Sequence, residues 1–461
     1  MFVPALLGKG RDGYRSLDRQ RHMGFDGSLV AESTITPALL VHDLARRPPS
    51  SLMKMPIRQI LDIFARAADR FETGQPDGLA PEEYVRKATL TSGLPLSINR
   101  QQTLGAFPPA MRMMEQFIRV QSPGGLDVFD SHVYQAEGVR IGFTPRGRNV
   151  GFVMPGNHPS THFMWMCALA MKIPVVVRPS SDDVFTPYRV AMALFEAGLP
   201  EDALIFVPGG HDLVDAIIGT CALSVLFGGQ PLADRYAANR SVRVHGPGRS
   251  KVVVLANADV DETVKLITRL VMDDAGRGCI NGSAVVVEGD ASKLAAAVAA
   301  ALDRVPIIAP INEDGRLGSV RPREAAAFNS MVDLGLGGGA AELTASRHGR
   351  VASVDGVDVM RPTVISVTSF EHPLFGMELP FPFVVFASAA RHELALAARH
   401  SLAVVVAGRD PVIAEELLME PTIDKVFAEG ALSTEFDPRE PHEGFLVDFL
   451  YMKKTLRSGV S

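Results

Sequence analysis

Cys279 lies in a segment whose residue types favour covalent chemistry at sulfur. Residues 274–282 read Asp-Ala-Gly-Arg-Gly-Cys-Ile-Asn-Gly, so glycines surround the thiol and let the backbone approach a ligand closely. A thiol in an ordinary core would not need such a turn. A cysteine thiolate attacks a carbonyl carbon and holds the acyl group as a thioester. The segment therefore predicts a covalent nucleophile, with an inert thiol as the alternative.

The other two cysteines have apolar surroundings. Cys167 stands within Phe-Met-Trp-Met-Cys-Ala-Leu, and Cys221 comes just before an apolar strand. Free cysteines of this kind behave as small buried hydrophobes, so we expect both thiols to be inert. A nucleophilic thiol needs a neighbour that favours the thiolate, and Arg277 or a helix end could supply it for Cys279.

Asn157 is the candidate partner of this thiol. Attack on a carbonyl creates an oxyanion, which preorganised N–H donors stabilise. Asn157 lies in a Pro-Gly-Asn-His-Pro turn directly after an expected strand, so its side-chain amide is a suitable donor beside the backbone N–H of Cys279. Taken by itself, an asparagine at this place is an ordinary turn residue.

The elements that must position these residues alternate along the chain. Continuous apolar strands at residues 149–155, 174–178, 204–207, 223–227 and 241–245 alternate with amphipathic helices, which predicts a parallel sheet covered on both faces. Such sheets bind ligands at the carboxyl ends of their strands. The turns there suit a phosphate or sugar: Pro155-Gly156-Asn157, Arg178-Pro179-Ser180, Pro208-Gly209-Gly210 and Gly228-Gly229. They carry no G-x-G-x-x-G fingerprint.

A second α/β block is expected from Lys251 onward, and it contains the Cys279 turn. The N-terminal region has an irregular start and then helical patterns, and the tail at 445–453 is strand-like, either at an internal edge or across a subunit boundary. We therefore expect three parts. They are an N-terminal helical arm with a cofactor-binding domain at 1–254, a catalytic domain at 255–431, and a C-terminal return with an oligomerisation strand at 432–461.

The composition limits the partners. A chain of 461 residues is too long for one compact core, and 47% hydrophobic residues, 21% charged residues and a net charge of -6 are typical of a soluble globular protein. The mildly acidic balance argues against nucleic acid or a polybasic membrane contact. The sequence shows neither a membrane-span-length apolar run nor a signal-peptide pattern, and no metal-ligand spacing. A cytoplasmic enzyme without a metal is expected.

Five segments, in order, resemble the aldehyde dehydrogenase superfamily over roughly residues 140–455. The Pro-Gly-Asn-His-Pro turn resembles its oxyanion turn, and residues 175–200 resemble its Lys-Pro-Ser segment with the following helix. Asp259 resembles its Ala-Asp element, and Gly-Arg-Gly-Cys its nucleophile signature. Pro362-Thr363 and the Glu-Leu-Pro-Phe-Pro run from Glu378 resemble its later motifs.

The resemblance implies two parallel-sheet α/β domains, a Rossmann-like cofactor domain and a catalytic domain, with NAD or NADP as cofactor. It implies that the cofactor is bound by residues at the strand ends and by one glutamate directed at the nicotinamide ribose: Pro155, Arg178, Pro179, Ser180, Gly209, Gly228, Gly229 and Glu378. This sequence differs from the family pattern at two of these positions. Arg178 stands where the family commonly has lysine, and the run at Glu378 lacks the family's Phe-Gly.

One branch of the superfamily is a closer match. Phe227-Gly228-Gly229 and the Val-His-Gly-Pro-Gly-Arg-Ser segment at 244–250 look like the acylating, CoA-dependent enzymes, including the acyl-CoA reductase of bacterial luminescence. The hydrolytic branch has a glutamate here that activates water, and His245 occupies the matching position. Without a carboxylate base, water attacks a thioester slowly, whereas a CoA thiolate needs no such base.

The resemblance thus implies NAD(P)-dependent reduction of an acyl-CoA or other acyl thioester to an aldehyde, or the reverse acylating oxidation, with CoA as co-substrate. Cys279, Asn157 and His245 are the catalytic candidates. An acyl carrier protein is the alternative thioester donor, and a homodimer or homotetramer is the expected assembly. Two alternatives stand beside this function: a hydrolytic aldehyde dehydrogenase with His245 as base, and a non-catalytic nucleotide-binding member.

Overall fold

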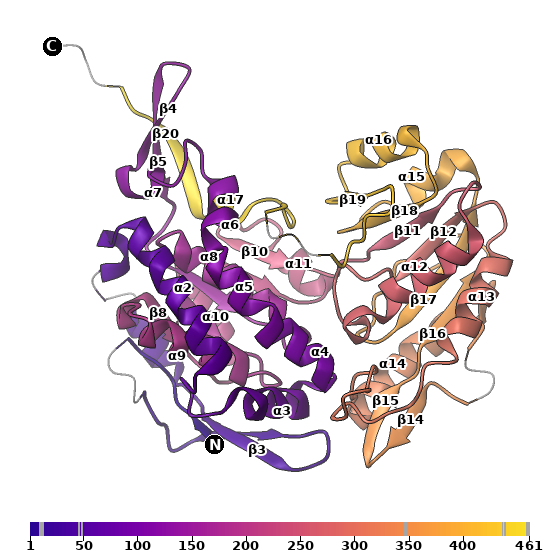
Figure 1. The fold of residues 1–461 in the computed structure, drawn as a ribbon, viewed down its shortest axis with the longest axis horizontal. Helices are drawn as coiled ribbons and strands as arrows, with labels where there is room; N and C mark the ends of the chain where they lie inside the picture. Colours follow the sequence, from indigo (N-terminus) through magenta and orange to yellow (C-terminus); the bar gives the residue numbers. More distant parts are fainter. Residues whose placement is uncertain are drawn as a thin grey trace. The chain divides into compact units, whose positions relative to one another are not determined.

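The structure is a computed structural model that describes residues 1–8, 13–44, 47, 49–344, 348–435, 437 and 439–457. The chain divides into two compact units, drawn in Figure 1. Unit 1 comprises Met1–Ser92, Asn99–Gly246 and Pro438–Ser461, and unit 2 comprises Gly93–Ile98 and Pro247–Asp437. Residues 247–254, which we expected in the first domain, belong to unit 2 because the strand at Lys251 pairs with the strands of that unit.

Unit 1 contains a five-stranded sheet of order β10-β9-β6-β7-β8, and all its strands run parallel. The strands are β6 (Val150–Val153), β7 (Val175–Arg178), β8 (Leu204–Phe206), β9 (Leu223–Phe227) and β10 (Val242–His245). The connecting helices are α8 (Phe163–Ala170), α9 (Phe185–Glu196), α10 (Asp212–Thr220) and α11 (Gln230–Tyr236). The order reverses beside β6, and open α/β sheets bind ligands at such a point. The predicted parallel sheet is confirmed.

Helices pack on this sheet through buried aliphatic side chains. Val176 and Ile205 pack against α10 and the short helix α1 (Ala38–Asp43). The long helix α2 (Ile57–Thr73) packs against α9. Arg189 of α9 is fully buried, and its guanidinium donates hydrogen bonds to the carbonyl oxygen of Phe71 at 2.9 Å and to Asp77 at 2.7 Å. This pairing satisfies a buried charge and ties α9 to the end of α2.

The N-terminal arm begins with a sheet, which the sequence did not predict. Strands β1 (Phe2–Val3), β2 (Arg19–Met23) and β3 (Leu29–Thr34) form a three-stranded sheet of order β1-β3-β2. Arg, Gln and Glu side chains in β2 and β3 break up the apolar pattern that a strand prediction needs. Three of the helices that follow match the expected helical patterns: α3 (Pro81–Ser92), α5 (Phe107–Arg112) and α6 (Met114–Gln121). The short helices α4 (Leu96–Arg100) and α7 (Val128–Ser131) were not predicted.

The C-terminal return is helix before it is strand. The prediction of a strand from residue 445 was wrong for helix α17 (Leu446–Leu450), because its four buried apolar residues pack at helical spacing. Strand β20 (Tyr451–Thr455) follows and pairs antiparallel with β5 (Val139–Pro145), which also pairs with β4 (Val133–Ala136). The tail therefore pairs inside its own chain.

Unit 2 is built on a seven-stranded sheet of order β13-β16-β17-β12-β11-β18-β19, parallel except for β13. Its strands are β11 (Lys251–Val254), β12 (Ala284–Glu288), β13 (Ala340–Glu342), β16 (Thr363–Val367), β17 (Phe383–Ala389), β18 (Val404–Ala407) and β19 (Val426–Phe427). A separate hairpin joins β14 (Val351–Val354) to β15 (Val357–Met360).

Helices cover both faces of this second sheet, as its apolar strands predict. Helices α12 (Val260–Met272) and α13 (Ser292–Leu302) pack on the face that carries Val252 and Val285. Helices α15 (Leu394–Ala397) and α16 (Pro411–Met419) pack on the face of Val253 and Val286, and α14 (Pro322–Gly335) packs there against β16 and β17. Within the described ranges, no helix is long and apolar enough to cross a membrane.

Candidate active-site residues and their environment

The Cys279 turn lies at the amino edge of the unit 2 sheet. Lys251 of β11 pairs with Ala284 of β12, and Ala284 pairs with Val385 of β17. Because these strands run parallel, the segments that precede them meet at one edge. The Gly-Pro-Gly-Arg-Ser segment, the cysteine turn and the Glu378 segment, which are far apart in sequence, are therefore neighbours in space. Sequence motifs alone did not show this arrangement.

The turn before Cys279 has a rare backbone conformation. Helix α12 ends at Met272, and Asp274 and Ala275 then adopt left-handed conformations with φ of 48° and 57°. Such conformations cost non-glycine residues about 1–2 kcal/mol and persist only when the surroundings impose them. At Gly276 a Cβ would lie 2.3 Å from the backbone nitrogen of Pro382. A side chain there would push apart the cysteine turn and the Glu378 segment.

The carbonyl group of Cys279 is held by the segment at 248–250. The Ser250 hydroxyl donates a hydrogen bond to the Cys279 carbonyl oxygen at 2.8 Å. The backbone N–H of Ala403 donates to the same hydroxyl at 3.2 Å, which fixes its direction. A Cβ at Gly248 would lie 1.9 Å from the Cys279 carbonyl oxygen, so no residue but glycine fits there. These contacts fix the peptide that follows the cysteine.

Glu378 holds the same segment from the other side. Its Oε2 accepts a hydrogen bond from the backbone N–H of Arg249 at 2.7 Å, and Gly248 donates a second backbone N–H. Arg249 has a left-handed φ of 48°, and this contact helps to stabilise it. Burial raises the pKa of the Glu378 carboxyl, and the two backbone hydrogen bonds partly oppose that rise. A small cavity in unit 2 is lined by the cysteine turn and Glu378 together.

The three cysteines differ in exposure. Cys279 is partly exposed, whereas Cys167 and Cys221 are buried, and burial raises the pKa of both thiols to about 12. The prediction that Cys167 and Cys221 are buried thiols is confirmed. Arg277, proposed above as a charge near the sulfur, donates a hydrogen bond from Nη2 to the carbonyl oxygen of Ser319 at 2.7 Å. Part of its hydrogen-bonding capacity therefore supports the chain at Ser319.

In unit 1, the turns that follow the strands meet at the carboxyl edge of the parallel sheet. The N–H of Met154 donates to the carbonyl oxygen of Arg178 at 2.9 Å, and the N–H of Gly228 donates to that of His245 at 3.1 Å. These contacts join the ends of neighbouring strands. The edge thereby gathers the residues that the sequence singled out for the cofactor: Pro155, Arg178, Pro179, Ser180, Gly209, Gly228 and Gly229.

The Arg178 guanidinium lies at this edge, and only some of its N–H groups have hydrogen-bond partners among the described residues. Its Nη2 donates to the carbonyl oxygen of Gly209 at 3.0 Å, while Nε is buried with no hydrogen-bond partner among the described residues. Burial lowers the pKa of its guanidinium, and the charge of Asp212 opposes this. A Cβ at Gly156 would lie 2.5 Å from the Ser180 hydroxyl, so the first two turns touch there. An unfilled donor among small residues fits an oxygen-rich ligand such as a nucleotide.

Asn157 follows β6 in an exposed turn that leads into η4 (Pro159–His162). The His158 ring accepts the N–H of Ser160 at 3.2 Å and so caps this short helix. Its neighbour Asn157 therefore stands in a turn of defined shape, at the strand where the sheet order reverses. The role of Asn157 as oxyanion donor stays a prediction.

His245 is the last residue of β10 and is only 5% exposed. Its Nδ1 lies 2.5 Å from Oε2 of Glu443, in the C-terminal return. The ring stacks on Phe227, with 5.0 Å between centroids and 24° between planes. The sequence predicted a role for His245 but not for Glu443. The polar segment around Glu443 contains no motif that indicates a contact with a residue about two hundred positions earlier.

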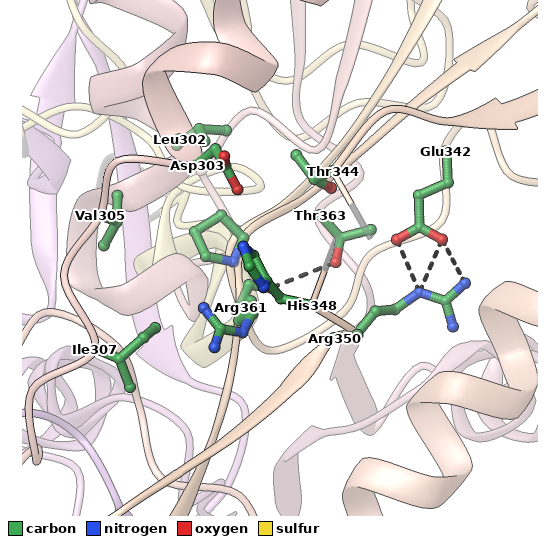
Figure 2. Close-up of a pocket in the computed structure, with 12 residues that line it drawn as sticks. Leu302, Asp303, Val305, Ile307, Glu342, Thr344, His348, Arg350, Arg361 and Thr363 are labelled. Atoms are coloured by element: carbon green, nitrogen blue, oxygen red, sulfur yellow. Dashed lines mark hydrogen bonds and ion pairs between the residues drawn. The ribbon is translucent and has the colours of Figure 1, made fainter. Parts of the chain in front are cut away.

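Another cavity in unit 2 lies away from these groups, beside β16 and the end of α13 (Figure 2). Arg361 and His348 line it, and Arg350 points at Glu342, with Nη2 and Oε2 2.6 Å apart. Arg350 and Glu342 therefore neutralise each other's charge at this wall. Throughout the described residues, no group of three or more His, Cys, Asp or Glu side chains could hold a metal ion.

A parallel α/β sheet with small-residue turns in one unit, and a glycine-framed cysteine in the other, are features typical of nucleotide-dependent oxidoreductases. The aldehyde dehydrogenase family profile matches residues 42–401. The chain belongs to the aldehyde dehydrogenase family, and the predicted family and fold class are confirmed.

Curated relatives match parts of the chain. A malonate-semialdehyde dehydrogenase of Bacillus mycoides is 34% identical over 147 residues, which cover 30% of each protein. Another of that name from Halalkalibacterium halodurans is 29% identical over 246 residues, or 50% of each protein. A geranial dehydrogenase of Castellaniella defragrans is 29% identical over 191 residues, covering 37% of this chain and 40% of that protein. The chain thus spans half or less of the length of these relatives.

Solved structures match over nearly the whole chain. A NAD-dependent benzaldehyde dehydrogenase from Corynebacterium glutamicum has a TM-score of 0.80 at 19% identity and covers 98% of both chains. A glyceraldehyde-3-phosphate dehydrogenase from Methanocaldococcus jannaschii, solved in complex with NADP, has a TM-score of 0.80 at 15% identity. It covers 96% of this chain and 99% of that one. At these identities the likeness establishes the fold.

Proposed function

We propose that this protein is an NAD(P)-dependent acyl-thioester reductase, equally able to run the reverse acylating oxidation of an aldehyde, through a thioester on Cys279. The observation that carries the proposal is the environment of this thiol. It is the partly exposed cysteine, and Ser250, Gly248 and Glu378 hold its turn in one shape. Preorganisation of this kind is what a nucleophile needs and an ordinary cysteine does not.

The chain's own groups divide the work. The Cys279 thiolate attacks the carbonyl carbon of an aldehyde or an acyl thioester, and the side-chain amide of Asn157 donates to the oxygen that becomes negative. The residues at the carboxyl edge of the unit 1 sheet hold a nicotinamide nucleotide. One donor is Nε of Arg178, which has no hydrogen-bond partner within the described part of the chain. When bound, this cofactor donates or accepts the hydride. Glu378 is proposed to reach the nicotinamide ribose.

A thiol then resolves the acyl group on Cys279. CoA is the proposed acceptor and donor, because a thiol of this kind is partly ionised near neutral pH and attacks a thioester readily. An acyl carrier protein presents the same thiol chemistry. The second candidate is a hydrolytic aldehyde dehydrogenase, favoured by the carboxylate that holds the His245 ring, because such a pair could activate water.

The two candidates are distinguished by turnover of an aldehyde with NAD(P), measured with and without CoA. The proposal predicts CoA-dependent reduction of the cofactor, with the acyl-CoA as product and with turnover abolished in C279A. Mass spectrometry of the enzyme without CoA should show one acyl group on Cys279. Release of free acid without CoA, lost in H245A, would favour the hydrolytic candidate. Full activity in C279A would end the proposal.

A further inference from the structure

The amino-terminal segment, which is the described part of residues 1–36, packs along one edge of the unit 1 sheet and belongs to the same unit. The backbone of Leu6 exchanges two hydrogen bonds of 2.8 Å with that of Phe206 in β8, the outermost strand on this side. Farther along the segment, two buried polar side chains contact the turns that follow β7 and β8. These turns carry residues that we propose for the nucleotide.

Thr36 holds the turn that follows β8. It is fully buried, and its backbone N–H at 3.0 Å and its hydroxyl at 2.7 Å both donate hydrogen bonds to the carbonyl oxygen of Pro208. A Cβ at Gly209 would lie 3.3 Å from the Thr36 nitrogen, so the two backbones are in close contact. The Gly209 carbonyl oxygen in turn accepts the hydrogen bond from Nη2 of Arg178. Thr36 thus fixes the start of the turn that orients the Arg178 guanidinium.

His22 of β2 holds the turn that follows β7. Its ring is only 3% exposed, with Nδ1 2.8 Å from the carbonyl oxygen of Ser181 and Nε2 2.8 Å from the hydroxyl of Ser33. Because a carbonyl oxygen only accepts, Nδ1 carries a proton and donates. Burial lowers the pKa of His22, although the Ser181 contact and the charge of Asp183 oppose this. The neutral ring therefore donates to the residue directly after the Arg178-Pro179-Ser180 turn.

The two turns depend on such contacts for their shape. Each connects a parallel strand to a helix, so its carbonyl oxygens lie beyond the strand ladder and need other donors. A binding site that adopts its competent conformation only part of the time binds its ligand correspondingly more weakly. Donors that hold the carbonyl groups of Pro208 and Ser181 restrict these turns before a nucleotide binds.

We propose that Thr36 and His22 are positioning residues for the nucleotide site, and that their hydrogen bonds to Pro208 and Ser181 set the affinity of the protein for NAD(P). This role rests on the proposed nucleotide site at the carboxyl edge of the unit 1 sheet. Both side chains act through backbone carbonyl groups and not on the nucleotide itself. A segment that only stabilised the fold would make the same contacts but would not affect nucleotide affinity.

The test uses two pairs of variants in the full-length chain. T36V replaces the hydroxyl with a methyl group, whereas T36S keeps the hydroxyl. H22N keeps an amide donor near the place of Nδ1, whereas H22Q places its amide near Nε2 and loses the donor to Ser181. The matched control is T34V. Thr34 is also fully buried, but its hydroxyl donates at 3.0 Å to the carbonyl oxygen of Tyr14, within the amino-terminal segment itself.

Isothermal titration calorimetry measures the dissociation constants for NAD and NADP, and thermal melts measure stability. We expect T36V and H22Q to bind the nucleotide about two- to tenfold more weakly, the change that loss of one hydrogen bond gives. T36S and H22N should recover most of the affinity. T34V should unfold at a lower temperature but bind like wild type. Alkylation of Cys279 by iodoacetamide without nucleotide should proceed at the wild-type rate in all five variants, because other residues hold its turn.

Wild-type affinity in T36V or in H22Q would overturn the positioning role of that residue and leave the proposed function intact. If T34V bound as weakly as T36V, general loosening of the segment would explain the loss, and the role of the two contacts would be refuted. If wild type bound neither NAD nor NADP, the proposed function itself would fail. Each contact has its own pair of variants, so failure of one variant to fold leaves the other contact to decide.

Discussion

The Ser250 hydroxyl donates a hydrogen bond at 2.8 Å to the carbonyl oxygen of Cys279, a residue on the neighbouring strand connection. The two lie together because β11 and β12 run parallel with Lys251 opposite Ala284. The Cys279 peptide is thus supported by a different segment from its own. In such a parallel arrangement, a change at Ser250 alters the direction of the cysteine peptide without touching the sulfur.

Replacing Ser250 with alanine tests this support. S250A removes the hydroxyl that donates to the Cys279 carbonyl, and a lost hydrogen bond of about 1 kcal/mol corresponds to roughly a fivefold change in an equilibrium. We therefore expect the rate at which iodoacetamide alkylates Cys279 to change by a comparable factor. Mass spectrometry of the labelled peptide measures this rate. S292A is the control, because that hydroxyl donates its hydrogen bond to nearby Asp290 on an exposed helix start. Equal alkylation of S250A and wild type would contradict the expected support.

Gly248 tests the same contact by steric means. In G248A the new methyl group would lie 1.9 Å from the Cys279 carbonyl oxygen, so the cysteine turn must move. Overpacking of this kind costs about 1–3 kcal/mol, and we expect a lower unfolding temperature together with loss of turnover. G219A is the control, since a Cβ there meets nothing within 4 Å. A fully active G248A would show that the turn tolerates displacement.

Glu378 has two roles that an experiment can separate. The carboxylate accepts the Arg249 N–H, and we also propose it as the anchor of the cofactor ribose. We expect E378A to slow alkylation of Cys279 even without cofactor, because the 248–250 segment loses its acceptor. E378Q keeps an acceptor oxygen, so it should alkylate more nearly like wild type but bind NAD(P) more weakly. If E378A changed only the cofactor affinity, measured by fluorescence titration, the supporting role would be refuted.

Much of the fold could be predicted from the sequence, because a parallel sheet buried on both faces leaves continuous apolar runs such as the three valines at 252–254 in β11. The glycine-framed cysteine could also be predicted, because the residue types around it are unusual for a buried core thiol. The β1-β3-β2 sheet was missed because its strands carry charged side chains. Glu443 was also missed: its contact with His245 depends on the path of the C-terminal return, which local pattern does not encode.

Lys251 predicts how stability changes at high pH. Its ammonium is buried at the start of β11 and donates hydrogen bonds to the carbonyl oxygens of Arg249 and Arg399 and to the Ser401 hydroxyl. Burial, together with the charge of Arg249, lowers the pKa of Lys251 from 10.5 to about 8. The folded protein therefore binds fewer protons here than the unfolded chain between these two values, so stability rises with pH across this window.

The buried Lys251 ammonium lowers the free energy of unfolding by about 3 kcal/mol at most. This destabilisation is fully present below pH 8 and vanishes above pH 10.5. We expect the unfolding temperature of wild type to rise relative to that of K251M between pH 8 and 10.5. Comparing two variants cancels the titration of all other groups. K293M serves as the control, because it removes a lysine from an exposed position. A wild-type minus K251M difference that stays constant over this range would mean that folding does not lower the pKa of Lys251.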